Sequence, residues 1–201
     1  LVSQTARVTG PAGEEIFCDE YGRVKVEFHW DRAGLGNDRS SCWLRVSSNW
    51  AGDSFGSVTI PRIGMEVVVT YLEGNPDHPL ITGCVPNAIT GAPYPLPAHK
   101  SKTVLRSRSS PATGGYNELS IEDRAGQEKI YLRAQRDLEQ MILNDSDIRI
   151  GNDRREQMTR DSHSLIGNDR FEQVGKNSSS LIKGDELHTT EGQRHTMIGG
   201  D

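Results

Sequence analysis

Apolar and aromatic residues are scarce in this chain of 201 residues. Hydrophobic residues make up 34% of the sequence and aromatic residues 6%, while glycine occurs 21 times. The mean hydropathy is −0.60. Few large side chains are therefore available for a core, and part of the chain must build its structure without a conventional one.

Disulfide pairs, long apolar runs and a secretion leader are also missing. The three cysteines, Cys18, Cys42 and Cys84, are odd in number and lack CxxC spacing, which favours free thiols in a chain made in the cytosol. No window approaches the roughly 18 apolar residues that cross a bilayer, and no basic-then-apolar leader indicates classical secretion. Because the chain begins at Leu1 and ends within a repeating pattern, we expect a fragment of a longer protein. The net charge of −5 argues against nucleic acid as a partner.

Five short runs between residues 16 and 90 have the composition of β-strands. In the first run, Val24, Val26, Phe28 and Trp30 alternate with polar residues and fall on one face. A cluster of turn formers, residues 73–79, separates the last two runs. The expected strands are 23–30, 42–46, 57–60, 65–72 and 80–85. So many short strands with almost no helical periodicity predict a small barrel.

The flanking segments have a different composition. Residues 1–15, with Gly10-Pro11 and Gly13, are expected to be an incoming connection. Residues 91–117 are rich in proline and basic residues, and we interpret them as an extended linker. The basic residues lack interleaved aromatics, which favours a solvated connector over a nucleic-acid patch. Strand-like alternation resumes in residues 118–201, at 119–121 and 130–132.

An apolar residue recurs at every eighth position from about residue 142, with a lapse at Thr190. Glycine often follows it, and a second period of 16 is visible because residues 150–157 return as 166–173 with one change. The period excludes the heptad of a coiled coil. The octad positions are Ile142, Ile150, Met158, Ile166, Val174, Ile182 and Ile198.

The octads predict a strand of about five residues followed by a Gly/Asn/Asp turn. The calcium-binding β-roll is a competing interpretation, because Gly-Asn-Asp resembles its turns. Its period is nine, however, and its glycine-rich signature is absent.

One apolar residue per octad cannot stabilise a single chain. Burying one isoleucine contributes roughly 1.5–3 kcal/mol, whereas ordering eight residues of backbone costs on the order of 8–16 kcal/mol. Three identical chains wound about one axis would pair every strand edge and bring the octad side chains together. The sequence therefore predicts a homotrimer with the octad positions on its axis.

Specific motifs over nearly the whole chain strengthen this interpretation. The chain resembles VgrG, the spike protein of type VI secretion systems, and more distantly the central spike of contractile phage tails. The residues that carry the resemblance are 19–26 (DEYGRVKV), 28–31 (FHWD), 41–46 (SCWLRV), 50–52 (WAG), 60–69 (IPRIGMEVVV), 72–79 (LEGNPDHP), 93–97 (PYPLP), 117–119 (NEL) and 122–123 (ED).

The resemblance implies an all-β homotrimer, with an oligonucleotide/oligosaccharide-binding (OB) barrel at 16–90. An intertwined triple-stranded β-helix follows at 118–201, with the octad repeats from about 142; we call it the needle. It implies a spike that pierces a target envelope and carries effectors, with no enzymatic activity and no cofactor. The partners implied are Hcp-type tube and baseplate proteins, a PAAR-type tip protein or C-terminal effector, and transiently the target membrane. Such a protein is made in the bacterial cytoplasm and leaves by contraction, to the exterior or into target cells.

Candidate catalytic and metal-binding residues are few. His29, with Ser41, could suggest a nucleophile and base, but His29 falls on the polar face of its strand and no Gly-x-Ser-x-Gly elbow is present. His163 and His195 lie at equivalent octad positions and could form rings of three imidazoles. Position 179 carries serine instead, which favours solvent-facing histidines, so we predict no catalytic residue and no metal site.

The alternative function is an OB-fold module that binds a ligand or single-stranded nucleic acid and carries an oligomerising stalk. Trp30, Trp43 and Trp50 could be its stacking platforms. Because Trp30 shares a face with Val24 and Val26, we expect all three tryptophans to serve core and subunit-interface packing.

Overall fold

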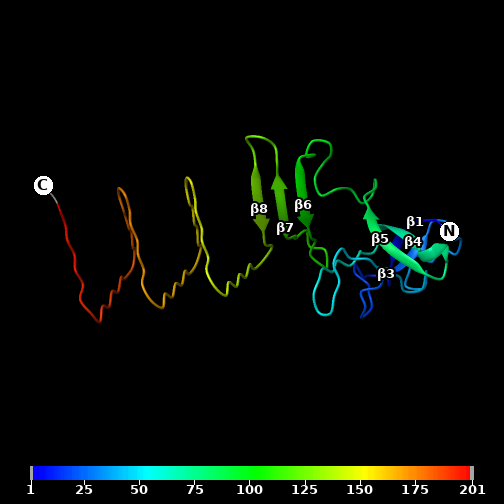
Figure 1. Cartoon of the computed structure of the whole chain (residues 1–201), viewed down its shortest axis with the longest axis horizontal. Helices are drawn as coiled ribbons and strands as arrows, with labels where there is room; N and C mark the ends of the chain where they lie inside the picture. The colour runs from blue at the N-terminus through cyan, green and yellow to red at the C-terminus, as the bar shows by residue number, and fades with distance from the viewer. Residues whose placement is uncertain (1, 200–201) are drawn as a thin grey trace. The chain divides into compact units, whose positions relative to one another are not determined.

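The structure is a computed structural model that describes residues 2–199 and divides the chain into two units, Leu1–Met141 and Ile142–Asp201. All the strands of the described part lie in the first unit, where they form two mainly antiparallel sheets (Figure 1). A single 3₁₀ turn, Leu72–Gly74, is the only helical segment in residues 2–199.

The first sheet closes into a barrel. Its strands are β1 (Gln4–Thr9), β2 (Lys25–Phe28), β3 (Arg45–Val46), β4 (Glu66–Tyr71) and β5 (Pro79–Val85). They run in the order β2-β1-β4-β5-β3, with β3 and β5 parallel and the other pairs antiparallel. A bridge between Val24 and Leu44, with N–O distances of 3.0 and 2.8 Å, joins the two ends of this order. The result is the five-stranded Greek-key barrel of an OB-fold.

The barrel interior is small and almost entirely aliphatic. In β4 buried and half-buried residues alternate along the strand, as expected where one face lies on a core. The fully or nearly fully buried apolar residues are Ala6, Val8, Val24, Val26, Leu44, Val67, Val69, Tyr71 and Ile81. Every strand of the barrel borders this cluster, so the barrel has a core of its own.

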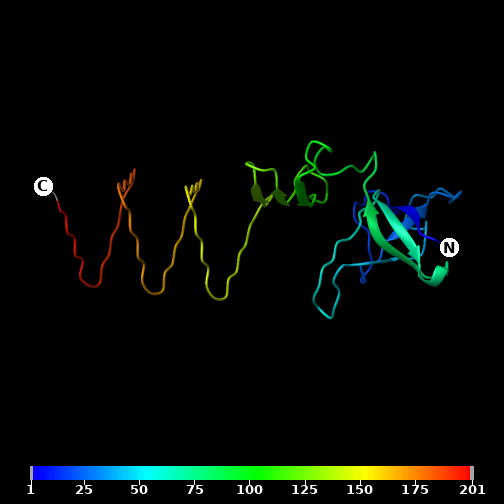
Figure 2. The ribbon, with the colours of Figure 1, turned by 45° about the horizontal axis from the view of Figure 1, so that its top comes forward.

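Four of the five strands expected from the sequence between residues 16 and 90 are present, as β2, β3, β4 and β5. The expected strand at 57–60 is wrong: these residues form a loop in which Val58 is exposed. The loop leaves the barrel as an open excursion (Figure 2). The Val24–Leu44 bridge explains the error, because a closed barrel has no free edge on which a further strand could pair.

Two strands lie where the sequence predicted connections. Residues 1–15 were expected to be an incoming connection, but β1 lies within them and pairs with both β2 and β4. Ala6 and Val8 of β1 are fully buried. Likewise, β6 (Lys102–Arg106) lies inside the expected linker at 91–117.

The second sheet is a three-stranded antiparallel meander. It consists of β6, β7 (Glu118–Glu122) and β8 (Lys129–Arg133), in that order (Figure 1). β7 and β8 match the alternation predicted at 119–121 and 130–132. The turn between them has Gly126 at a φ of 76° and a hydrogen bond from the Gln127 amide to the Arg124 carbonyl of 2.9 Å. A residue with a side chain would be strained at that φ.

Ile81 offers a direct test of the barrel core, because it is fully buried. We expect Ile81→Ala to destabilise the barrel by about 2–5 kcal/mol through lost burial and the cavity left behind. Urea unfolding followed by tryptophan fluorescence would measure this, since the three tryptophans all lie within residues 30–50. Val58→Ala is the matched control at an 80% exposed position and should change stability by less than about 0.5 kcal/mol. Equal losses in both variants would contradict the assigned core.

Candidate trimerisation surface

The backbone of the second unit bends once every eight residues. Figures 1 and 2 show this unit as a succession of extended segments that reverse direction at regular intervals. Each bend directly follows an octad position, and six residues separate one bend from the next. The bends are at 143–144, 151–152, 159–160, 167–168, 175–176, 183–184 and 191–192. The period of the sequence is thus also the period of the backbone.

Ion pairs between residues two apart show that the segments are extended. Asp153 and Arg155 are 2.7 Å apart at their charged atoms, and Arg154 contacts Glu156. Arg170 and Glu172 form the equivalent pair at 2.7 Å. Side chains two residues apart share a face only in an extended backbone. Each segment therefore has two distinct faces, one of which carries the octad residue.

The backbone polar groups of these segments have no partners in their own chain. Among residues 134–199, all within the described part, no backbone–backbone hydrogen bond is present. Each extended segment consequently presents two open edges of N–H and C=O groups. Such edges are templates for pairing with other chains.

The octad side chains lie on the more sheltered face of each segment. From Ile142 to Ile182 their exposed fractions lie between 47% and 58%, whereas Leu165, Leu181 and Met197, one residue before an octad position, are 84–99% exposed. Ile198, next to the last described residue, is 91% exposed. Half of each octad side chain thus remains available for contact with other chains.

The total surface also indicates association. The chain exposes 17,903 Å², nearly twice the roughly 9,400 Å² expected for a compact monomer of 22.2 kDa. Large exposed apolar areas on a folded protein mark interaction surfaces.

The sheet of β6, β7 and β8 leaves its apolar face open. In the register of the sheet, Leu105 pairs with Leu119 and Leu119 with Leu132, while Ile121 pairs with Ile130. Side chains that pair across strands share a face. These five residues, which we call the apolar sheet face, are 36–74% exposed.

On the opposite face of this sheet, the part around Glu118 is polar and covered. Glu118 is buried, accepts hydrogen bonds from Tyr94 Oη at 2.6 Å and from Arg106 Nε at 2.5 Å, and pairs with Arg106. Burial opposes ionisation of this carboxyl, but the hydrogen bonds from Tyr94, Ser120 and Arg106 outweigh it and hold the pKa of Glu118 below its ordinary value. The bond to Glu118 also raises the pKa of Tyr94. This cluster fixes the proline-rich segment to β6 and β7.

Stacked cations extend the cluster along the sheet. The Arg106 guanidinium lies 4.4 Å from the Tyr94 ring centre and 4.5 Å from that of Tyr116, and Arg133 lies 3.9 Å from Tyr116. Cation–π contacts of this kind stabilise a surface by about 0.5–1 kcal/mol each. The polar face is thereby fixed within one chain, and the apolar face is the one left for partners.

The three tryptophans lie outside the barrel core. Trp30 is 65% exposed, stacks on Phe28 and donates from Nε1 to Gln4 Oε1 at 2.9 Å. Trp50 is 64% exposed and meets Phe55 edge-on in the loop between β3 and β4. The expectation of core packing is therefore wrong for these two, because both residues lie beyond the strands that line the core. Their use at a subunit interface stays a prediction.

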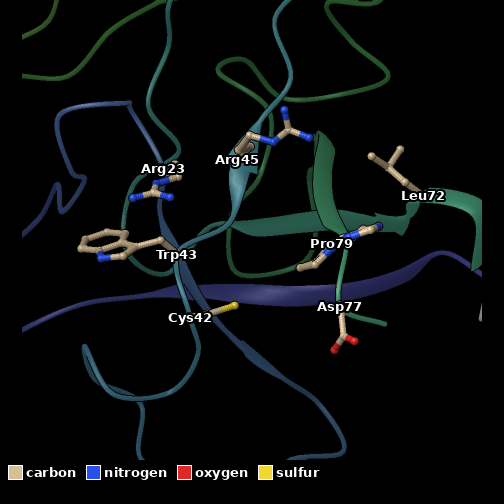
Figure 3. Close-up of a pocket in the computed structure, with 8 residues that line it drawn as sticks. Arg23, Cys42, Trp43, Arg45, Leu72, Asp77 and Pro79 are labelled. Carbon is tan, nitrogen blue, oxygen red and sulfur yellow. The ribbon is translucent and has the colours of Figure 1, made fainter. Parts of the chain in front are cut away.

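Trp43 borders an open cavity of about 450 Å³ together with Arg23, Arg45 and Asp77 (Figure 3). The Arg23 guanidinium is already paired with Asp19 at 2.5 Å. The Trp43 ring lies against Phe17 and under the Lys25 ammonium, 4.9 Å away. With these partners in place, the cavity lacks the free aromatic faces that stack nucleic-acid bases.

The residues weighed as catalytic do not form a site. Ser41 Oγ donates to the Cys42 carbonyl oxygen at 2.6 Å and accepts from the Val26 amide at 3.0 Å, so its hydroxyl is used in holding the strand. His29 is exposed. The three cysteines are free and exposed. Within residues 2–199 of the single chain, no group of three or more potential ligands could hold a metal ion.

His163 and His195 each lie three residues before an octad position, Ile166 and Ile198. An odd spacing on an extended segment places them on the face opposite to the octad residue, which supports the expectation that they face solvent. His188, by contrast, lies two residues before Thr190 and shares its face. The sequence analysis did not single out His188, although its even spacing from Thr190 already predicts that it lies on the octad face.

No helix within the described residues has the length and apolar character to span a membrane.

Comparison with known proteins shows which class of protein the barrel and the repeat region define. The family profile "Type VI secretion system/phage-baseplate injector OB domain" matches residues 18–85, and "Bacteriophage T4 gp5 C-terminal trimerisation domain" matches residues 103–201. The chain is thus an injector-type protein that joins an OB domain to a β-helical trimerisation domain, and its fold is all-β.

Relatives identify the family within this class. They include the type VI secretion system spike proteins VgrG4b (60% identical over 154 residues) and VgrG5 (56% over 154 residues) of Pseudomonas aeruginosa. The actin cross-linking toxin VgrG1 of Vibrio cholerae is 56% identical over 145 residues. The alignments cover 72–77% of this chain but only 13–20% of the relatives. The chain belongs to the VgrG family of type VI secretion spike proteins, of which it spans a minor part.

Acid should weaken the Glu118 cluster. Because the pKa of Glu118 is lowered in the folded state from an ordinary value near 4.5, its contribution to stability is present above that value and is lost as the pH falls through the folded pKa. We expect Glu118→Gln to reduce the fall in melting temperature between about pH 5 and pH 3. The reduction will be partial, since the pKa values of Glu15, Asp19, Glu66 and Glu122 are also lowered.

Glu128→Gln is the control, because Glu128 is an exposed carboxylate of the same sheet region without a salt bridge in the described residues. It should keep the wild-type pH profile in thermal melts followed by circular dichroism. A Glu118→Gln profile that runs parallel to the wild type would show that the cluster carries no charge-dependent stability.

Proposed function

We propose that this chain forms the OB-barrel and needle portion of a homotrimeric type VI secretion spike that pierces a target envelope and carries effectors. In the trimer, extended segments of three chains pair edge to edge and the octad side chains meet on one axis. The observation that carries this proposal is the second unit: its backbone lacks partners in its own chain, and from Ile142 to Ile182 one face of each segment holds a half-covered apolar residue. The axial residues are Ile142, Ile150, Met158, Ile166, Val174, Ile182 and Ile198.

The mechanical role follows from the way such a rod is held together. Backbone hydrogen bonds between chains at every segment would make it stiff, and charged outward side chains such as Arg149 and Arg155 would keep its surface wet. Force from a contracting sheath would drive it through a membrane, and the polar exterior would let it leave the lipid. No bond is made or broken by this portion of the protein.

The partners are those that a spike in this position requires. We propose an Hcp-type tube and baseplate below the barrel, and a PAAR-type tip protein or a C-terminal effector beyond the needle. Synthesis in the bacterial cytoplasm and release by contraction complete the proposal. The names of the relatives support the spike over the alternative of a ligand- or nucleic-acid-binding module.

The axial assignment predicts that the same substitution to aspartate disrupts the trimer at Ile166 but is tolerated at the neighbouring Leu165. Ile166→Asp would bring three carboxylates together near one axis, at several kcal/mol for each desolvated charge. Leu165→Asp, at a position that is 99% exposed, would place the same charge on the outside. Light scattering of the wild type and of Leu165→Asp should give about three times 22.2 kDa, with a lower mass or a much lower melting temperature for Ile166→Asp.

Two results would overturn different parts of the proposal. A monomeric wild type would exclude the trimer itself. A trimeric wild type whose two variants behave alike would retain the trimer and reject the axial positions.

The apolar sheet face should also contribute to the trimer. We expect Leu132→Glu to lower the melting temperature of the trimer, because a charge would replace an apolar side chain in a buried contact. Lys129→Gln removes a charge on the same strand but on the opposite face and should have a small effect. Equal melting temperatures for wild type and Leu132→Glu would mean that this face stays open to solvent.

A further inference from the structure

The octad in which the apolar residue lapses has a distinctive polar face. Thr190 occupies the octad position, and His188 and Glu186 lie two and four residues before it on the extended segment 185–190. His188 Nε2 and Glu186 Oε1 are 2.6 Å apart. All three side chains therefore share the face that carries Ile166 and Ile182 in other octads.

The four octads from Met158 to Ile182 also carry polar residues at these two places, but of a different chemistry. Arg154–Glu156 and Arg170–Glu172 occupy the equivalent positions as ion pairs, and serines occupy them in the octads of Ile166 and Ile182. A guanidinium has no lone pair to offer a metal ion, and each pair neutralises itself. Within the described needle, His188 is the only imidazole on the octad face.

The contact with Glu186 prepares His188 to act as a ligand. When Nε2 carries the proton and donates it to the carboxylate, the lone pair of Nδ1 is free. Carboxylate–histidine pairs of this kind orient the metal-binding imidazoles of proteins. Threonine in place of isoleucine also removes bulk beside the ring and adds a hydroxyl group.

We infer that Glu186, His188 and Thr190 of three chains form a site for one divalent transition-metal ion on the needle axis, with three imidazoles as ligands. Three histidines with a fourth position for water suit Zn²⁺. The site is incomplete without the partner copies, and the inference rests on the proposed trimer. The ion would offset the repulsion of three carboxylates gathered at one level.

The test measures metal in the full chain. After incubation with Zn²⁺ and dialysis, the wild type should retain one zinc for every three chains. Removal of zinc with a chelator should lower its melting temperature. His188→Ala should abolish retention, and Glu186→Gln should weaken zinc affinity about 10–100-fold, as for other residues that orient a ligand. His163→Ala and His195→Ala are matched controls on the opposite face and should retain zinc.

Co²⁺ provides a measurement on the unaltered protein, so the test does not depend on whether a variant folds. Bound Co²⁺ should give the intense visible absorption of a four-coordinate site. Zinc retention that is lost in His163→Ala or His195→Ala would overturn the inference in favour of surface binding. Light scattering on the same samples separates the two hypotheses: a trimer without stoichiometric metal refutes the site alone, whereas a monomer refutes the proposed spike.

Discussion

The unpaired backbone of the extended segments in residues 142–199 is the constraint on which the needle depends. A peptide chain can leave its N–H and C=O groups to water, but a rigid extended chain cannot be built from water-bonded segments with one apolar side chain each. One apolar residue per octad can therefore stabilise the extended segments only when several chains associate. Its bends keep the segments equal in length, and its half-covered apolar residues mark the face that partners must cover.

The barrel and the extended segments of residues 142–199 represent opposite solutions to the problem of strand edges. The barrel closes on itself through the Val24–Leu44 bridge and fills its interior with aliphatic side chains. The extended segments of the needle leave both of their edges unpaired within one chain. Between them in sequence, the sheet of β6, β7 and β8 combines both solutions: it fixes one face through Glu118 and leaves five apolar side chains on the other. The barrel thus has a core within one chain, whereas in the proposed trimer folding of the needle would be coupled to association.

Periodicity determined how much of this arrangement could be predicted from the sequence. Alternation located β2, β7 and β8, short apolar runs located β3, β4 and β5, and the octad located every bend. β1 was not predicted because Gly10-Pro11, a turn signal, directly follows it. β6 was not predicted because its lysine and arginine are typical of a solvated linker. Neither error could be corrected locally, since pairing partners distant in sequence make both segments strands. Residues 57–60 alternate as a strand would, but the closed barrel offers no free strand edge with which they could pair.

For the histidines of the needle, the spacing to the nearest octad residue is more informative than the residue type, because odd and even spacings lie on opposite faces of an extended segment. His163 and His195 attract attention because they are equivalent in the repeat, yet equivalence to each other says nothing about direction. Direction is set by the distance to an octad residue, which is odd for these two and even for His188. A needle whose polar layers alternate with apolar ones also loses stability relative to a wholly apolar axis. In the proposed trimer, the layer at Thr190 would differ from every other layer of the described needle, so a slip of the chains by one or two octads would misalign it. Such a layer would favour a single register in a rod whose repeats are otherwise nearly interchangeable.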